Sequence, residues 1–378
     1  MNDQWIPARV DDAVTDVDTP ALILDLDRFE GNLARLMSAI QGRGIRVRPH
    51  AKSHKCVEIA RRQMAAGAIG ICCQKTSEAE PFLAGGISDV LISNEVVGDR
   101  KTVQLARLAA SYPDARLGVC VDDPRAVAQL ARACEQARTQ LDVYIELDVG
   151  HNRAGVADIG AVVALGHSIA SHVNLSMRGL HAYFGNAQHL RSIAERRQAI
   201  TAATATAQAA QRALIAAGLR CDVITGAGTG TFMLEAASGV YTEIQPGSYD
   251  LGGSGNIKKK KEIACAAFEQ SLMILTTVMS RRKDAQHDRA TLDAGLKSFS
   301  TDSGPALPAF AGWQVRGVSD EHTVLDRNGA GPDLLLGDKA LLIPGHIDPT
   351  VNLHDWIVAV RGDRVEAVWP IEARGAIF

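Results

Sequence analysis

The 378-residue sequence predicts an α/β fold in which a (β/α)8 TIM barrel is followed by a C-terminal antiparallel β domain. Three observations lead to this prediction. Short apolar runs alternate with amphipathic helical stretches from about residue 20 to 250, a pattern typical of strand–helix units around a parallel sheet. From about residue 268 the pattern changes to strands separated by turns. The chain is also long for one domain.

The first part of the chain contains nine strand candidates, one more than such a barrel needs. They are 21–26, 45–49, 69–73, 89–93, 116–121, 142–148, 176–183, 221–225 and 241–246. The first helix is marked by apolar residues at helical spacing: Phe29, Leu33, Leu36, Met37 and Ile40. Asp27 and Glu30 resemble a capping box at its start, and an alanine-rich helix is predicted over about 192–217.

In the second part, strands are predicted over 272–278 and 340–344, followed by a hairpin of 357–360 and 365–368. The junction at 251–257, together with the lysine run 258–261, indicates a mobile loop whose lysines face solvent.

Composition narrows the class of function. With 40 basic and 43 acidic residues, the sequence argues against a nucleic-acid or membrane-surface partner. The N-terminus does not resemble a signal peptide, and no segment approaches the roughly 20 apolar residues that span a bilayer. Seven cysteines form no C-x-x-C pair, and several lie in apolar strand-like runs. We therefore expect reduced thiols and a cytoplasmic protein.

Lys52 is the first candidate for chemistry, because it follows the strand candidate 45–49 among other basic groups. The carboxyl ends of barrel strands are where α/β proteins hold their active sites. Neighbouring positive charge, here from His50, His54 and Lys55, favours the neutral amine that attacks a carbonyl or forms a Schiff base. On this motif alone, a solvated loop lysine is an equal alternative.

Two turns after the last strand candidates resemble phosphate-binding loops. The glycine-rich run 225–230 lets backbone N–H groups converge on an anion, and 245–249 lies on the same predicted rim. Barrels commonly bind phosphate with the loops after their last two strands. The alternative is a structural turn, since the order of the glycines is not a nucleotide fingerprint.

Two further motifs carry charge or ligand groups. Arg153 follows the strand 142–148 on a glycine-flanked turn and would point a permanent cation at the same rim. In the β domain, His346 and Asp348 would face one side of an extended segment and share a divalent cation. A surface arginine and a chance H-x-D pair are the alternatives.

Taken together, these motifs resemble the metal-activated D-threonine aldolases and the D-3-hydroxyaspartate aldolases, and more distantly the D-serine dehydratases. The segments that carry the resemblance are Arg48-Pro49-His50-Ala51-Lys52-x-His54-Lys55-Cys56, Gly70-Ile71-Cys72-Cys73-Gln74-Lys75, Ser93-Asn94-Glu95-Val96-Val97, the glycine turn at 226–230 and Pro344-x-His346-x-Asp348-Pro349-Thr350-x-Asn352-x-His354-Asp355. The likeness extends over nearly the whole chain.

The resemblance implies a pyridoxal-phosphate (PLP) enzyme of fold type III, the alanine racemase-like fold, which is typically a homodimer. It implies an N-terminal segment 1–26 that pairs with the β domain, a PLP-binding barrel over 27–250 and a β domain over 251–378 that carries the metal site. Lys52 would hold the cofactor as a Schiff base, and His189 would lie near the substrate hydroxyl. Other expected cofactor contacts are Gln74, Arg153 and Tyr183 at the ring and Thr225, Gly226, Ala227, Gly228, Ser248 and Tyr249 at the phosphate, with His346 and Asp348 binding the metal.

The implied reaction is retro-aldol cleavage of a D-3-hydroxy amino acid of the D-threonine type to glycine and an aldehyde. Alternatives are a D-3-hydroxyaspartate aldolase that releases glyoxylate and a D-serine or D-hydroxyaspartate dehydratase. Asp348 is a hard ligand suited to manganese or magnesium, where the dehydrating relatives carry a cysteine. The segment 250–255 departs from the family, which leaves the preferred side chain open. A non-catalytic PLP carrier and a metal hydrolase are more distant alternatives.

Overall fold

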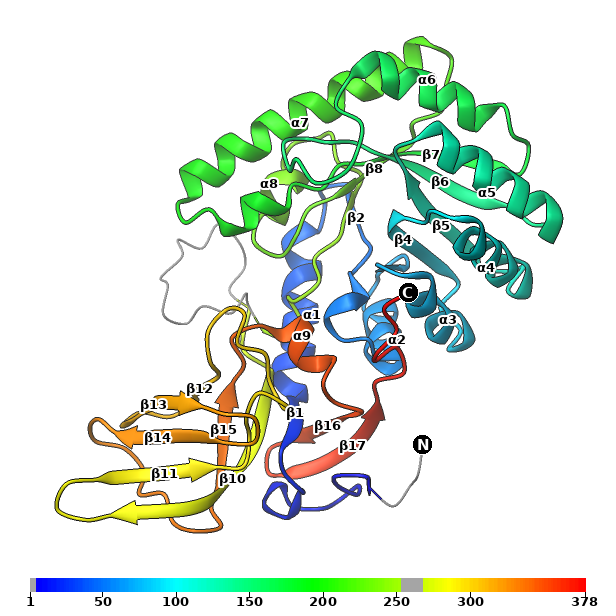
Figure 1. The fold of residues 1–378 in the computed structure, drawn as a ribbon. Coiled ribbons are helices and arrows are strands. Elements are labelled where there is room, and N and C mark those ends of the chain that lie inside the picture. The colour runs from blue at the N-terminus through cyan, green and yellow to red at the C-terminus, as the bar shows by residue number, and fades with distance from the viewer. Residues whose placement is uncertain (1–4, 253–267) are drawn as a thin grey trace.

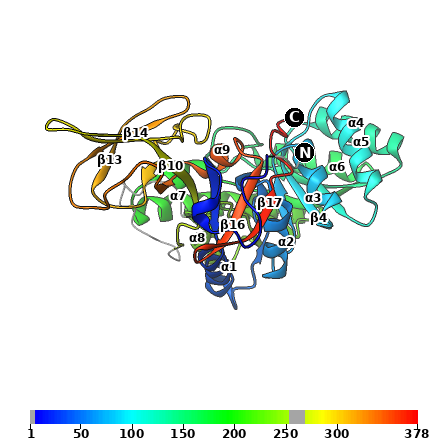
Figure 2. The ribbon, with the colours of Figure 1, turned by 90° about the horizontal axis from the view of Figure 1, so that it is seen from below.

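The computed structural model describes residues 5–252 and 268–378, which form a barrel region and a β domain (Figure 1). Seen from below, the β13–β14 end of the β domain and the α4–α5 side of the barrel lie at opposite ends of the molecule (Figure 2). Most of the loop predicted over 251–257, and all of the lysine run 258–261, lie outside the described residues.

Eight parallel strands form the barrel sheet in the order β2-β9-β8-β7-β6-β5-β4-β3. They are β2 Arg46–Val47, β3 Ile71–Cys73, β4 Asp89–Glu95, β5 Arg116–Val121, β6 Leu141–Glu146, β7 Leu175–His181, β8 Val223–Gly226 and β9 Glu243–Ile244. The two ends of this order meet where the amide of Cys72 donates to the carbonyl of Pro49 at 2.8 Å. The predicted fold class is confirmed.

Helices connect the barrel strands and bury their apolar faces against the sheet. They are α1 Leu26–Ile40, α2 Val57–Ala65, α3 Thr76–Ala84, α4 Asp99–Ser111, α5 Pro124–Ala137, α6 Ile159–Ala170, α7 Ile193–Ala216 and α8 Phe232–Ala236, with short 3-10 turns η2 Val14–Asp16, η3 Ala51–Ser53 and η4 Gly185–His189. The capping box predicted at Asp27 is wrong. Strand β1 leads directly into α1, so Asp25 is the N-cap and accepts from the amide of Arg28.

The surplus strand candidate, 21–26, belongs to the sheet of the β domain. Strand β1 pairs antiparallel with β10 and parallel with β16. The elements of this domain are β1 Ala21–Asp25, β10 Leu272–Lys283, β11 Asp288–Leu292, β12 Leu307–Pro308, β13 Trp313–Val318, β14 Thr323–Arg327, β15 Lys339–Ile343, α9 Ile347–Val351, β16 Trp356–Arg361 and β17 Arg364–Pro370. Helix α9 lies against η3, which brings the β domain to the carboxyl end of the first barrel strand.

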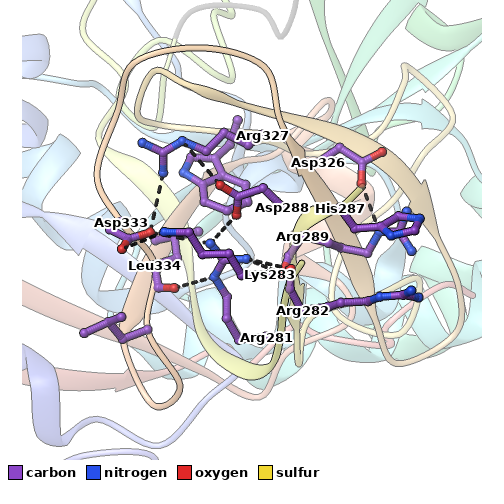
Figure 3. Close-up of polar contacts among 12 residues, drawn as sticks. Arg281, Arg282, Lys283, His287, Asp288, Arg289, Asp326, Arg327, Asp333 and Leu334 are labelled. Atoms are coloured by element: carbon purple, nitrogen blue, oxygen red, sulfur yellow. Dashed lines mark hydrogen bonds and ion pairs between the residues drawn. The ribbon is translucent and has the colours of Figure 1, made fainter. Parts of the chain in front are cut away.

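At the outer end of the β domain, arginine and aspartate side chains of neighbouring strands pair with one another (Figure 3). The guanidinium carbons of Arg281 and Arg327 lie 5.0 and 5.3 Å from the centroid of the Trp313 ring. Asp288 contacts both arginines. This end of the sheet is therefore stabilised by cation–π contacts to the buried Trp313 ring and by ionic contacts around it.

Among the residues that the structure describes, no helix combines the length and apolarity needed to cross a membrane.

Candidate active site at the carboxyl rim of the barrel

A cavity of about 370 Å³ opens at the carboxyl ends of the barrel strands, where the β domain covers part of the rim. Its volume is in the range of pockets that hold cofactor-sized ligands. Ten of the residues predicted for the site line it: Lys52, Gln74, Arg153, Tyr183, His189, Ala227, Gly228, Ser248, His346 and Asp348. The cavity therefore brings together groups separated by almost 300 positions in sequence.

Lys52 lies on η3, and buried contacts fix the segment on both sides of it. The hydroxyl of Ser53 donates to the carbonyl of Gly247 at 2.8 Å, which ties η3 to the loop after β9. The amine of Lys55 donates to the carboxylate of Glu78 at 2.6 Å, and both side chains are nearly inaccessible to solvent. Glu78 also accepts from the backbone amide of Gln74 at 2.7 Å. These contacts fix the segments of Lys52 and Gln74 relative to each other.

The neighbours of Lys52 do not supply the positive charge that the sequence suggested. Burial lowers the pKa of His50 well below its ordinary value, and the Lys52 and Arg153 charges lower it further. Burial likewise lowers the pKa of His54 to about 3. Since Lys55 is paired with Glu78, the expected ring of cations is wrong. His50 is instead a neutral ring that contacts Gln74 and Ser93, its Nε2 lying 2.8 and 3.1 Å from their polar atoms.

The glycine-rich loop after β8 reaches the cavity only in part. Ala227 and Gly228 line it, and Ala227 has φ 71°, a left-handed conformation that glycine adopts without a Cβ penalty. A side chain at Gly228 would lie 2.8 Å from Gln188, whose amide oxygen accepts from the backbone of Gly230. The loop is therefore packed tightly against η4.

Three residues predicted to hold phosphate are not among those that line the cavity. The hydroxyl of Thr225 is buried and accepts from the side-chain amide of Gln245 at 2.8 Å. Gly226 lies against the carbonyl of Ala182. The ring of Tyr249 packs on Phe268 with centroids 5.7 Å apart, and burial raises the pKa of its phenol. Thr229, which belongs to the predicted run 225–230 but was not one of the individually expected phosphate contacts, lines the cavity instead.

Arg153 and Tyr183 lie on neighbouring turns at the rim. The carboxylate of Asp148 accepts from the amides of Gly150 and Asn152 at 2.9 and 3.1 Å, which shapes the turn that presents Arg153. The guanidinium carbon of Arg153 lies 5.9 Å from the centroid of the Tyr183 ring. His189 ends η4 on the same side and is exposed.

The β domain contributes His346 and Asp348 from the start of α9. His346 is the N-cap in an extended conformation, whereas Asp348 is in the first helical turn. The prediction of an extended segment here is therefore wrong, because the chain turns into a helix directly after His346. Both residues nevertheless line the cavity.

A buried polar network forms the floor of the cavity, and sequence reasoning missed it. His181 contacts the carboxylate of Glu146 through Nδ1 and the amide oxygen of Gln245 through Nε2, the latter at 3.1 Å. Burial lowers the pKa of His181, but the adjacent Glu146 together with Gln245 and Glu95 outweighs it, so that the net shift is upward. Their positions in the sequence could have indicated them: Glu146 ends β6, His181 ends β7, and Gln245 directly follows β9.

Ligand-type atoms of Cys120, Glu146 and His181 lie within 4.8 Å of one another, as in a metal site. Both ring nitrogens of His181 are already hydrogen-bonded, and burial raises the pKa of the Cys120 thiol well above its ordinary value. A protonated thiol is a poor ligand. We therefore interpret this group as the hydrogen-bonded floor of the cavity.

A (β/α)8 barrel with a rim lysine, a glycine-rich loop and a β domain covering the rim is the architecture of the fold-type III PLP enzymes. The sequence matches the alanine racemase N-terminal domain over residues 24–254 and a putative serine dehydratase domain over residues 271–360. The chain belongs to the alanine racemase-like family and, within it, to the group that contains the D-threonine and 3-hydroxy-D-aspartate aldolases.

Individual relatives are similar over almost their whole length. A D-threonine aldolase of Arthrobacter sp. is 45% identical, with 98% of this chain and 96% of the relative covered. A 3-hydroxy-D-aspartate aldolase of Paracoccus denitrificans (strain Pd 1222) is 42% identical over 98% of this chain and 95% of its own. The crystal structure of D-threonine aldolase from Filomicrobium marinum superimposes with a TM-score of 0.93 at 43% identity, covering 99% of this chain and 100% of that one.

Proposed function

We propose that this chain is a PLP- and divalent-metal-dependent aldolase that cleaves D-3-hydroxy amino acids of the D-threonine type to glycine and an aldehyde. The observation that carries the proposal is that a single cavity is lined by Lys52 from the barrel and by His346 and Asp348 from the β domain. Family membership supports the same reaction, since relatives that are 45% and 42% identical over 98% of the chain are aldolases, whereas the dehydratase relatives are 29% identical or less.

The cavity fits the cofactor by the chemistry of its donors. Lys52 offers the amine for covalent attachment, and Ala227, Gly228, Ser248 and Thr229 offer backbone amides and hydroxyls suited to a phosphate. Once bound, PLP supplies an electron sink for the carbanion left by bond cleavage. Three predicted residues lie behind this surface and shape the loops: Thr225 and Gly226 at the end of β8, and Tyr249 in the loop after β9.

Gln74, Tyr183 and Arg153 would border the pyridine ring. Arg153 is a permanent cation, and a guanidinium cannot protonate the ring nitrogen. The electron sink is therefore weaker than with an acidic partner, so the reaction depends more on help at the substrate hydroxyl.

That help would come from the β-domain side of the cavity. The imidazole of His346 and the carboxylate of Asp348 are a donor set suited to Mn²⁺ or Mg²⁺, with water or substrate oxygens as the remaining ligands. A cation there would lower the pKa of the β-hydroxyl. His189, exposed at the same rim, is the group we assign to accept the hydroxyl proton.

Product analysis tests this function. Purified protein is incubated with D-threonine or D-3-hydroxyaspartate, with and without chelator, and the products are identified. We expect glycine with acetaldehyde or glyoxylate, and loss of turnover with chelator. A 2-oxo acid with ammonia would show a dehydratase and refute the aldolase proposal.

The cofactor has a separate test. The wild-type protein should carry a yellow chromophore that borohydride reduction fixes covalently, and Lys52→Ala should lack it. A chromophore that survives this substitution would refute the assignment of Lys52.

A further inference from the structure

A second carboxylate lies beside the proposed metal ligand His346. Asp302, on the loop between β11 and β12, places its Oδ2 2.7 Å from Nδ1 of the His346 imidazole. Its neighbour Ser303 lines the cavity, whereas Asp302 does not. Asp302 therefore contacts the proposed metal ligand His346 without itself lining the cavity.

Hydrogen bonds attach the Asp302 loop to the start of α9. The amide of Ser300 donates to the hydroxyl of Thr350 at 3.1 Å, and that hydroxyl donates to the carbonyl of His346 at 2.6 Å. The hydroxyl of Ser300 donates to Oδ1 of Asp302 at 2.6 Å. These hydrogen bonds hold the Asp302 carboxylate in a fixed position relative to the backbone of His346, whose ring it contacts.

This contact decides which ring nitrogen can bind a cation. An ionised carboxylate only accepts hydrogen bonds, so the Nδ1 of His346 that faces Asp302 carries the hydrogen. In a neutral imidazole the other nitrogen, Nε2, is then the free donor for a metal. Metal-ligating histidines commonly have such an outer carboxylate, which fixes the tautomer and the ring orientation.

We propose that Asp302 is the positioning residue of the metal site, holding His346 with Nδ1 protonated and Nε2 presented to the cation shared with Asp348. The inference rests on the proposed function, because it assumes that this cation binds. Asp302 is not assigned as a third ligand: within residues 5–252 and 268–378, its carboxylate does not form a set of mutually close ligand atoms with His346 and Asp348.

A plain surface ion pair is the alternative to exclude. The His346 and Asp302 side chains are 42% and 51% exposed, and exposed pairs contribute little to stability. The chain offers a matched control in the turn between β10 and β11. There Nδ1 of His287 lies 3.0 Å from Oδ1 of Asp284, which is also exposed and does not line the cavity.

The test is Mn²⁺ affinity, measured on the holoenzyme from the electron paramagnetic resonance signal of free Mn²⁺. The variants are Asp302→Ala, Asp302→Asn, the control Asp284→Asn and the ligand variant Asp348→Asn. We expect Asp302→Ala to weaken Mn²⁺ binding about 10–100-fold. Asp302→Asn should weaken it less, because the amide oxygen still accepts from Nδ1. Asp284→Asn should bind like the wild type.

Activity at saturating Mn²⁺ adds a second readout. If Asp302 acts only by positioning His346, excess Mn²⁺ restores kcat in Asp302→Ala, and the PLP absorbance is unchanged throughout. Circular dichroism confirms that each variant is folded.

Each other result is decisive. Wild-type affinity in Asp302→Ala overturns the inference and leaves the proposed function standing. Loss of Mn²⁺ binding in Asp302→Ala as complete as in Asp348→Asn would make Asp302 a ligand and also overturn it. Failure of the wild-type holoenzyme to bind Mn²⁺ overturns the metal-dependent function itself.

Discussion

The two halves of the cavity are built in different ways. On the barrel side, the charged groups that support the Lys52 segment are buried and paired: the Lys55 and Glu78 side chains are 9% and 5% exposed. On the β-domain side, His346 and its partner Asp302 remain 42% and 51% exposed. The Lys52 segment is thus fixed by its own contacts, whereas the β-domain half of the cavity, where we propose the metal site (the metal half), stays open to solvent. The first arrangement would suit the proposed covalently held cofactor, and the second the proposed exchangeable cation.

The difference has an energetic basis. A buried charge that loses its partner has no water to replace it, so substitutions in the barrel half carry a large cost in folding free energy. An exposed side chain that loses its partner is solvated at once. Substitutions in the barrel half should therefore reduce stability, whereas substitutions in the metal half should reduce activity with little change in stability.

The largest effect on stability is expected from Glu78→Ala. The substitution leaves the Lys55 charge buried and the amide of Gln74 without its acceptor. We expect a loss of about 3–5 kcal/mol in the free energy of unfolding, measured with urea. Glu58→Ala is the control, since Glu58 pairs with Arg62 on the surface of α2. A loss below about 1 kcal/mol for Glu78→Ala would contradict the contrast between the halves.

His346→Ala should show the opposite pattern. Its side chain is half exposed, so we expect a change in unfolding free energy within about 0.5 kcal/mol. Activity should fall about 100-fold or more and no longer respond to added Mn²⁺, because a Lewis acid is worth several kcal/mol to such a reaction. The check is kcat/KM across a Mn²⁺ titration beside a melting curve. A large fall in the melting temperature would show that the metal half is also structural.

Lowering the pH should destabilise the barrel half. His54 is buried neutral with a folded-state pKa of about 3, and its Nδ1 accepts from the amide of Cys56. A lowered pKa contributes stability above the unfolded pKa of about 6.5, and this stability is lost as pH falls toward 3. His54→Asn should therefore flatten the dependence of the unfolding free energy on pH in that window. If the unfolding free energy changes with pH equally in the wild type and in His54→Asn, the assignment of His54 as a buried neutral histidine is refuted.

The smallest effect is expected at the outer end of the β domain. Asp326 accepts from Arg289 at 2.9 Å and from Arg316 at 3.1 Å at the surface (Figure 3 labels Asp326 and Arg289). Asp326→Asn should reduce the free energy of unfolding by less than about 1 kcal/mol, and salt should remove the difference. Activity should be unchanged. A loss of activity would show that the outer end of the β domain is coupled to the cavity.

Local features of the sequence predicted the fold closely. The predicted strand 116–121 has the bounds of β5, and the predicted alanine-rich helix differs from α7 by one residue at each end. These elements are set by side-chain periodicity and by caps such as Ser192, which act over a few residues. The start of α1 was misplaced because Asp25 and Asp27 are equally good caps in sequence, and the end of β1 decides between them.

What the sequence determined by itself was the order of strands and helices, the motifs around Lys52 and the presence of His346 and Asp348. The tertiary structure decided that these three residues face one cavity, that β1 pairs with β10 and β16, and that His50 and His54 are neutral. The physical reason is that periodicity and turn chemistry are properties of neighbouring residues. Burial, desolvation and the partner of each charge depend on residues far away in the chain.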